Sequence, residues 1–285
     1  MVISGGYYGY QQIGHKSPAV FDENQAYQDV KTQLDFGPRV VGSAAHERAV
    51  AWMVSELKAA GWQVEVQSTT YQGHPVENVI GKRGTGTPWI ILGAHYDSRM
   101  YASQDPDPAK RTDPVPGAND GASGVAVLLE LARILPKDLN KQVWLVMIDA
   151  EDNGEIAGWD WLLGSEAFVA SLKEKPNAAV IIDMIGDAHL DIYQERNSNP
   201  AMNRAIWQTA SDLGYGQEFI PQYKFSMLDD HTPFLQAGIP AVDVIDFDYP
   251  YWHTTQDTLD KVSAKSLKVV GDTLLKWLEG PLETQ

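Results

Sequence analysis

The chain of 285 residues contains no cysteine. This absence excludes a disulfide framework, a thiol nucleophile and a zinc site built on thiolates. Any metal must therefore be held by histidine and carboxylate side chains, which is the ligand set of catalytic sites rather than of structural ones. The absence does not settle the compartment, because the cytosol and bacterial export are both compatible with it.

Long apolar runs and basic residues are also scarce. No run approaches the roughly 18 consecutive apolar residues that cross a membrane, so we expect no membrane span. The chain has 22 Lys and Arg against 38 Asp and Glu, which gives a formal net charge of −16. This charge argues against nucleic acid and against an anionic membrane as partners. The remaining composition, 44% hydrophobic and 21% charged, is ordinary for a soluble globular protein.

Four short apolar runs are typical of strands that are covered on both faces of a sheet. They cover residues 88–94, 142–148, 178–185 and 241–247. Two further strands are expected to form an antiparallel, peripheral pair, and one more is expected to be short. These lie at residues 62–71, 77–82 and 189–193.

Helical patterns separate the strands, and the pattern of residues 44–60 is clearly amphipathic. The predicted helices cover residues 22–34, 44–60, 123–135, 162–174, 201–213, 232–237 and 264–278. Residues 99–116, rich in Asp and Pro, are expected to form a loop, and residues 1–20 an irregular arm on the surface. No internal repeat or low-complexity linker divides the chain, so we expect one α/β domain over residues 1–285.

Polar clusters follow the carboxyl ends of the predicted inner strands. They are His95 with Asp97, Glu151 with Asp152, Asp183, and Trp252 with His253, and a fifth pair, Asn119 and Asp120, precedes a helix. In open α/β sheets, ligands bind outside the carboxyl ends of the strands. We therefore expect these side chains to gather at one edge of the sheet and to form a site.

Each residue alone has a simpler explanation. His95 is compatible with a hydrogen-bonded histidine at a strand end, Asp120 with a helix N-cap, and His253 with loop packing. Asp183 is harder to explain in this way, because a lone carboxylate in a buried strand needs a partner. Together the clusters favour a metal site, since imidazole mixed with carboxylate and no thiolate suits zinc better than magnesium or calcium.

The strand at 142–148 runs into three carboxylates, Asp149, Glu151 and Asp152. Acidic groups crowded at the end of a buried strand repel one another and lose hydration, which a fold tolerates when a cation, a proton or a function compensates. We expect Glu151 to work beside the metal. We expect Asp149 to be structural, fixing the turn or a neighbouring loop.

Six motifs that contain these residues, in this order, resemble the M28 family of zinc-dependent exopeptidases and their close relatives, the glutaminyl cyclases. The motifs are AHYDS (94–98), GANDGASGVAVLLELAR (117–133), DAED (149–152), IDMIGD (182–187), LDDHTPFLQAGIPAVDVID (228–246) and YWHTTQDTLD (251–260). The resemblance implies an α/β fold: a single-domain three-layer α/β/α sandwich with a mixed, mostly parallel sheet, as in zinc aminopeptidases.

The resemblance also implies roles for the site residues. The zinc ion common to both branches would be held by Asp120, Asp152 and His253. Glu151 would be the general base and acid. In the two-zinc aminopeptidases the positions of His95 and Asp183 hold a second zinc ion, whereas the cyclases keep both residues and bind one. Many members have Glu at the position of Asp152, and because Asp is one methylene shorter, its loop must approach the metal more closely.

Two features resemble the cyclase branch in particular. Asp229 precedes the Asp-His pair, where aminopeptidases usually have a small residue and cyclases have a carboxylate facing the one at Asp183. Two such carboxylates can share a proton. An aromatic-Pro pair followed by a Trp directly before the ligand His resembles the cyclase pocket for a glutamine side chain. The residues expected to bind substrate are Trp252, Tyr249, Trp159 and Trp161.

The expected function is that of a zinc-dependent glutaminyl-peptide cyclotransferase with one Zn²⁺, in which Glu151, Asp183 and Asp229 are catalytic. Its partners would be peptides or proteins with N-terminal Gln. The alternative is a two-zinc M28 aminopeptidase that hydrolyses N-terminal residues. Residues 1–18 lack the basic and apolar segments of a signal peptide. The resemblance suggests export to the periplasm or secretion, with the leader absent from this chain, and a cytoplasmic location stays open.

Overall fold

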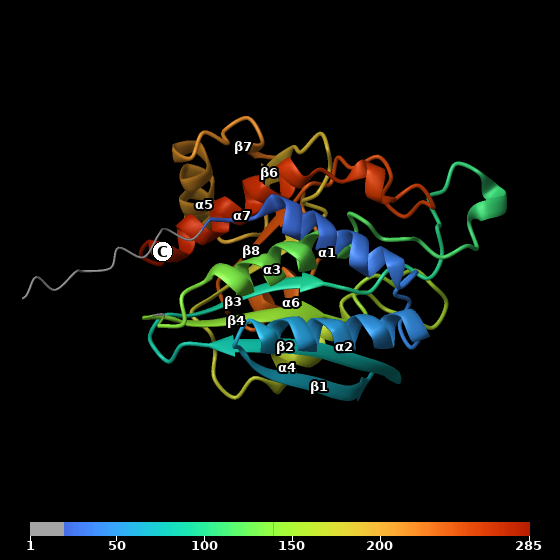
Figure 1. The fold of residues 1–285 in the computed structure, drawn as a ribbon, viewed down its shortest axis with the longest axis horizontal. Helices are drawn as coiled ribbons and strands as arrows, with labels where there is room; N and C mark the ends of the chain where they lie inside the picture. The colour runs from blue at the N-terminus through green and yellow to red at the C-terminus, as the bar shows by residue number, and fades with distance from the viewer. Residues whose placement is uncertain (1–19, 139) are drawn as a thin grey trace, which may run out of the picture.

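The computed structural model describes residues 20–138 and 140–285. A six-stranded sheet with the order β1-β2-β4-β3-β5-β8 forms its centre (Figure 1). The strands are β1 (Gln63–Tyr71), β2 (His74–Arg83), β3 (Trp89–His95), β4 (Gln142–Ile148), β5 (Ala178–Asp183) and β8 (Ala241–Ile245). Strand β2 is antiparallel to β1 and β4, while β4, β3, β5 and β8 run parallel to one another. The predicted arm at residues 1–20 lies, apart from Val20, outside the described residues.

The inner strands are apolar along their length because both faces of the sheet are covered. In β4, Val143, Leu145 and Met147 belong to the larger hydrophobic core, on one face. Val146 and Ile148 point the other way and belong to a second core. Successive side chains of a strand alternate between faces, so one continuous apolar run supplies both cores.

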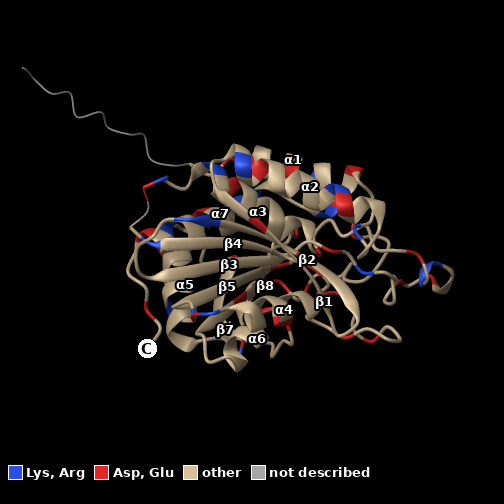
Figure 2. Ribbon diagram, turned by 90° about the horizontal axis from the view of Figure 1, so that it is seen from below, with Lys and Arg blue, Asp and Glu red and all other residues tan. Residues whose placement is uncertain are grey.

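Helices cover the two faces of this sheet, which confirms the predicted three-layer α/β/α sandwich (Figure 2). The larger core is shared with α1 (Glu23–Asp35), α2 (Ala44–Ala59), α3 (Ala122–Ile134) and α7 (Ala264–Glu279). The second core is closed by α4 (Leu163–Ser171) and α6 (His231–Gln236), through Phe168 and Phe234. Helix α5 (Pro200–Asp212) packs on α7 and on a small sheet of β6 (Ile192–Gln194) and β7 (Phe219–Tyr223).

Capping side chains fix where several helices begin. The Asp22 carboxylate accepts the backbone N–H groups of Asn24 and Gln25, at 3.0 and 3.1 Å, and α1 follows. Ser43 Oγ accepts the N–H of His46 at 3.2 Å at the start of α2. These bonds satisfy backbone donors that have no partner within a helix. Among the described residues, no helix is both long and apolar enough to cross a membrane.

Four strands differ from the sequence prediction. Strand β2 is not peripheral, because it pairs with β4 as well as with β1, with Val79 opposite Met147. Strand β7 was not predicted, since its sequence FIPQY contains a proline, which disfavours a strand assignment. Strands β5 and β8 end two residues earlier than predicted. In β5 the reason is local: Met184 has a φ of 47°, which takes the chain out of the strand.

The parallel direction of the inner strands brings the predicted functional segments to one edge of the sheet. His95 is the last residue of β3 and Asp183 the last of β5. Residues 149–152 directly follow the end of β4 at Ile148. The helix α3 begins after Gly121, next to the same edge. The fold therefore places these segments where α/β proteins bind their ligands.

Candidate functional site

A pocket of about 300 Å³ lies at this edge. Its walls combine acidic and imidazole side chains with apolar ones. The polar wall contains Asp120, Glu151, Asp152, Asp183, Asp229 and His253, and the apolar wall contains Trp161, Met184, Met227, Leu228, Ile245, Phe247 and Trp252. All the residues predicted to be catalytic, and the three predicted to hold the first zinc ion, therefore share one pocket.

Asp120 lies between the two histidines of the site. Its Oδ1 is 3.2 Å from His95 Nε2, and its Oδ2 is 3.7 Å from His253 Nε2. His95 Nε2 is also 3.1 Å from Asp183 Oδ1, and His253 Nε2 is 2.8 Å from Asp152 Oδ1. Two groups that could hold a metal ion result, and Asp120 belongs to both: His95, Asp120 and Asp183, and Asp120, Asp152 and His253.

Unpaired oxygens show that this cluster lacks a partner. Asp120 Oδ2 and Asp152 Oδ2 are buried and have no hydrogen-bond donor. An unpaired carboxylate oxygen in the interior carries a desolvation cost that a bound cation removes. Burial raises the pKa of Asp152, and the charge of Asp120 raises it further. Two carboxylates, one imidazole and no thiolate match the donor set of a catalytic zinc site.

Backbone contacts fix the position of Asp120. The carboxylate of Asp257 accepts the N–H of Asn119 at 2.9 Å and that of Asp120 at 3.1 Å. The N-cap position of α3 is held by Gly121, without a side-chain cap. The interpretation of Asp120 as an N-cap is therefore wrong. Although burial opposes it, the hydrogen bond and charge of His95 lower the pKa of Asp120.

The turn after β4 is held by carboxylates on both sides. Asp97 accepts the N–H of Glu151 at 3.1 Å and that of Asp152 at 3.3 Å. Asp149 lies 2.7 Å from His46 Nε2 and accepts the N–H of Glu77 at 2.8 Å. These contacts confirm the structural role predicted for Asp149. The side chains of Glu151 and Asp152, in the same turn, line the pocket.

The carboxylate of Glu151 lines the pocket and accepts no hydrogen bond from the described residues, although the backbone of Glu151 is hydrogen-bonded. Burial raises the pKa of Glu151 well above its usual range, and the nearby charges of Asp152 and Asp229 raise it further, against the effect of His95. A carboxyl group with a raised pKa is a stronger base than an ordinary one and can accept a proton and return it.

Asp183 and Asp229 form a second acidic pair in the same pocket. Burial raises the pKa of Asp183 to about 7; His95 lowers it, and the charge of Asp229 raises it. Asp229 Oδ1 accepts the backbone N–H of Asp230, while its Oδ2 is buried without a partner. The charge of Asp229 thus makes the ionised form of Asp183 less favourable.

His253 is held between two indole rings. The ring of Trp252 stacks on it at 3.7 Å between centroids, and that of Trp161 lies parallel at 6.0 Å. The backbone of His253 has a φ of 56°, a left-handed conformation that is uncommon for a residue other than glycine. Both Trp residues line the pocket as predicted.

The other two aromatic residues predicted to bind substrate do not line the pocket. Trp159 instead stacks on His74, at 3.8 Å between centroids, because the loop of residues 153–161 turns it away. Tyr249 is 3% exposed and donates its hydroxyl to Asp257 Oδ1 at 2.6 Å. Its hydroxyl supports the carboxylate that fixes Asp120. Direct substrate contact stays a prediction for both residues.

Three residues support the site; the sequence predicted Asp97 only as a member of the cluster with His95, and predicted no role for Arg99 and Asp257. Asp97 and Asp257 hold the backbone of the site, and Arg99 donates to Asp152 O at 3.0 Å and to Gly154 O at 3.0 Å. Asp97 and Asp257 lie within the motifs AHYDS and YWHTTQDTLD, two and four residues from a predicted metal ligand. That proximity is the signal by which they could have been found.

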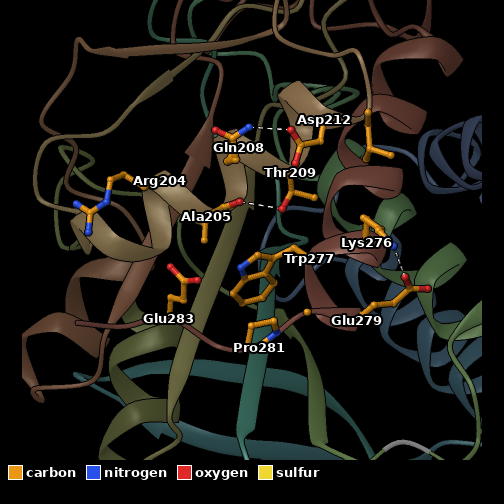
Figure 3. Close-up of a pocket in the computed structure, with 12 residues that line it drawn as sticks. Arg204, Ala205, Gln208, Thr209, Asp212, Lys276, Trp277, Glu279, Pro281 and Glu283 are labelled. Atoms are coloured by element: carbon orange, nitrogen blue, oxygen red, sulfur yellow. Dashed lines mark hydrogen bonds and ion pairs between the residues drawn. The ribbon is translucent and has the colours of Figure 1, made fainter.

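A larger hollow, of about 730 Å³, lies between α5 and the end of α7 (Figure 3). Its polar side chains pair locally: Gln208 with Asp212 at 2.7 Å, and Lys276 with Glu279 at 2.9 Å. Within residues 20–138 and 140–285, all members of the two metal-competent groups except the buried His95 line the smaller pocket instead. The candidate site is therefore the pocket around Asp120.

Comparisons with known proteins show the family of this chain. The model of peptidase family M28 matches residues 78–278. The crystal structure of Tannerella forsythia glutaminyl cyclase superposes with a TM-score of 0.86 at 33% identity, covering 92% of this chain and 100% of that one. A Zn-dependent exopeptidase from Parabacteroides distasonis superposes with a TM-score of 0.86 at 31% identity, covering 92% and 99%. The glutaminyl-peptide cyclotransferase of Bos taurus is 26% identical, over 85% of this chain and 78% of that protein. This chain belongs to peptidase family M28.

Proposed function

We propose that this protein is a zinc-dependent glutaminyl-peptide cyclotransferase, which converts the N-terminal Gln of a peptide to pyroglutamate and releases ammonia. The observation that carries the proposal is the acidic pair of Asp183 and Asp229 in one narrow pocket beside Trp252. An aminopeptidase needs no carboxylate at position 229. The similarity to the glutaminyl cyclase of T. forsythia supports the same activity.

One zinc ion would be held by Asp120, Asp152 and His253, which lie together and leave two buried carboxylate oxygens unpaired. When bound, zinc supplies Lewis-acid polarisation of the side-chain amide carbonyl of the substrate. His95 keeps contact with Asp120 and Asp183 and would hold both carboxylates in place.

Glu151 would move the proton that the reaction requires. It takes a proton from the α-amine of the substrate as the amine nitrogen bonds to the side-chain amide carbon. It then returns the proton to the amide nitrogen as the original C–N bond breaks, and ammonia leaves. The raised pKa of Glu151 suits both halves of this transfer. The ring closes within one substrate molecule, so positioning supplies much of the rate.

The remaining groups would orient the glutamine side chain. Its amide nitrogen carries two N–H donors, which the free oxygens of Asp183 and Asp229 can accept. Trp252 and Trp161 form apolar walls on either side of His253. Walls of this kind keep water from the reacting carbon, where it would give hydrolysis to glutamate instead.

A two-zinc aminopeptidase is the second candidate, because His95, Asp120 and Asp183 form another group that could hold an ion. The similarity to the Zn-dependent exopeptidase of P. distasonis supports it. In that case Glu151 would relay a proton from water to the leaving amine. The natural substrates would again be peptides, and export remains the expectation for the compartment.

A comparison of two peptides tests the proposal. Zinc-loaded protein is incubated with a Gln-initiated peptide and with a matched peptide that starts with Leu. We expect ammonia and pyroglutamate from the first and no cleavage of the second, and loss of activity after chelation that zinc restores. A Glu151→Gln variant should be at least about 100-fold slower. Cleavage of the Leu peptide by protein holding about two zinc ions per chain would contradict the proposal.

A further inference from the structure

The predicted loop between β3 and α3 contains three buried residues near its start. Its outer part, with a short 3₁₀ helix at Pro108–Lys110, projects from the body of the protein (Figure 1). Residues 99–105 stay close to the body of the protein, and three of them are buried. Arg99 is 2% exposed, Ala102 0% and Asp105 1%. Burial of an arginine and an aspartate costs free energy unless hydrogen bonds and ion pairs compensate. The contacts of Arg99 and Asp105 provide this compensation.

Arg99 holds the turn that carries Asp152. Its guanidinium donates to Asp152 O at 3.0 Å, to Gly154 O at 3.0 Å and, more weakly, to Asp152 Oδ1 at 3.4 Å. The same guanidinium lies over the ring of Trp161 at 5.0 Å. A planar guanidinium with several donors fixes such a turn in a way that a flexible ammonium cannot.

Gln104 and Asp105 hold the turn that carries His253. The N–H of Gln104 donates to His253 O at 3.1 Å. Asp105 Oδ2 accepts both the N–H of Thr255 at 2.9 Å and its hydroxyl at 2.6 Å. His253 between these anchors has a left-handed backbone, which persists only where the surroundings enforce it.

We propose that residues 99–105 form a positioning clamp that sets Asp152 and His253 against each other for the zinc ion. Residues Arg99 and Asp105 touch neither a reacting atom nor a free ligand oxygen. They act mainly through the backbone of the two ligand-bearing turns, which come from distant parts of the chain, together with the Thr255 hydroxyl and a 3.4 Å contact of Arg99 with Asp152 Oδ1. The inference rests on the zinc site of the proposed function, and it goes further by assigning metal affinity to a segment outside the ligand set.

The expected effect is on zinc affinity. Residues that orient metal ligands typically change affinity by about 10–100-fold when they are removed. Asp105→Ala deletes both anchors of Thr255 and should weaken zinc binding about 10-fold. Asp105→Asn keeps one acceptor oxygen and should restore most of the affinity. Asp107→Ala is the matched control, because this exposed carboxylate of the same loop binds the nearby N–H of Ala109, at 3.0 Å.

Zinc affinity is measured by competition with a chromophoric chelator on metal-free protein, with near-ultraviolet circular dichroism as the check of folding. Wild-type affinity in a folded Asp105→Ala variant would overturn the clamp. If that variant does not fold, Thr255→Val removes only the hydroxyl donor and should weaken zinc binding a few-fold, and no change in affinity would contradict the clamp.

The readout separates the clamp from the proposed activity. Weaker zinc binding in Asp105→Ala, combined with cleavage of Leu peptides by the unaltered protein, would leave the clamp standing and overturn the cyclase. Pyroglutamate formation by the unaltered protein, combined with unchanged zinc affinity in Asp105→Ala, would support the cyclase and overturn the clamp. Failure of the unaltered protein to bind zinc would overturn both.

Discussion

The carboxylate of Asp229 lines the pocket. One of its oxygens accepts the backbone N–H of its neighbour Asp230, and the other is buried without a hydrogen-bond partner among the described residues. The bond at Oδ1 fixes the carboxylate, and Oδ2 remains as the acceptor without a partner. In the proposed reaction that acceptor holds one N–H of the substrate amide. Asp183 holds the other and lies 3.1 Å from His95, so the two acids are anchored from different directions.

Replacement of Asp229 tests whether this oxygen binds substrate. In Asp229→Asn, one of the two carboxylate oxygens is replaced by an NH2 group, which donates and cannot accept. The variant therefore loses either the acceptor for the substrate or the acceptor for the N–H of Asp230. Loss of a hydrogen bond to a charged group costs about 1.5–3 kcal/mol, so kcat/KM for a Gln peptide should fall by about 10–100-fold. Steady-state kinetics on protein of verified zinc content measures this.

The matched control is Asp248→Asn. Asp248 is a half-exposed carboxylate on the 246–252 loop, paired with Lys224 at the surface. We expect its removal to change kcat/KM less than about two-fold, since exposed ion pairs contribute little. Equal losses in both variants would mean that general acidity near the pocket, rather than the Asp229 oxygen, governs the rate.

Residue identities at the site were predictable where a strand end or a motif fixed them. His95 and Asp183 end parallel strands, so the direction of their side chains follows from the sheet. Trp159 and Tyr249 lie in loops, where no period fixes the side-chain direction, and both point away from the pocket. Trp161 was correctly placed although it lies two residues from Trp159.

At the scale of elements, the start of α3 depends on one glycine. Gly121 has a φ of 97°, and a Cβ there would lie 2.6 Å from Asp97 O. Gly121→Ala should therefore carry the cost of a left-handed residue, about 1–2 kcal/mol, plus the cost of displacing Asp97. Urea unfolding of the metal-free protein measures the free-energy change, which we expect to exceed about 2 kcal/mol.

Gly158→Ala is the control for this variant. Gly158 has a φ of 88°, but nothing lies within 4 Å of the place that a Cβ would occupy. It should carry only the conformational cost, about 1–2 kcal/mol. If the two variants were equally destabilised, close packing of α3 against the Asp97 segment would not be what requires glycine at position 121.

The elements themselves were predicted unevenly. The inner strands are found from the sequence because burial on both faces leaves a continuous apolar run, as at 142–148. The place of β2 inside the sheet depends on pairing with β4, more than 50 residues later, which no local pattern encodes. Residues 99–105 form the loop that was predicted, but the burial of Asp105 against the His253 turn is a long-range contact that no local pattern encodes.

At the scale of the whole molecule, the net charge is −16, and several of the acidic side chains that contribute to it are buried. Asp246, fully buried outside the metal-competent groups, shows the consequence without the complication of the metal. Burial raises its pKa to about 7, although the N–H groups of Asp191 and Asp248 donate to it. The native protein therefore keeps a proton on Asp246 that the unfolded chain loses near its ordinary pKa of 3.8.

The sign of the resulting pH dependence follows from this difference. Below about pH 4 both states are protonated and the stabilising contribution is complete; it is lost as pH rises through about 7. Between pH 5 and 8 this one group should lower the free energy of unfolding by on the order of 2 kcal/mol. Urea unfolding of metal-free protein at both pH values measures it, and Asp246→Asn should flatten the slope. Asp35→Asn, on an exposed carboxylate, removes the same charge and should leave the slope as it is. A slope that is unchanged in Asp246→Asn would assign the pH dependence to overall charge repulsion instead.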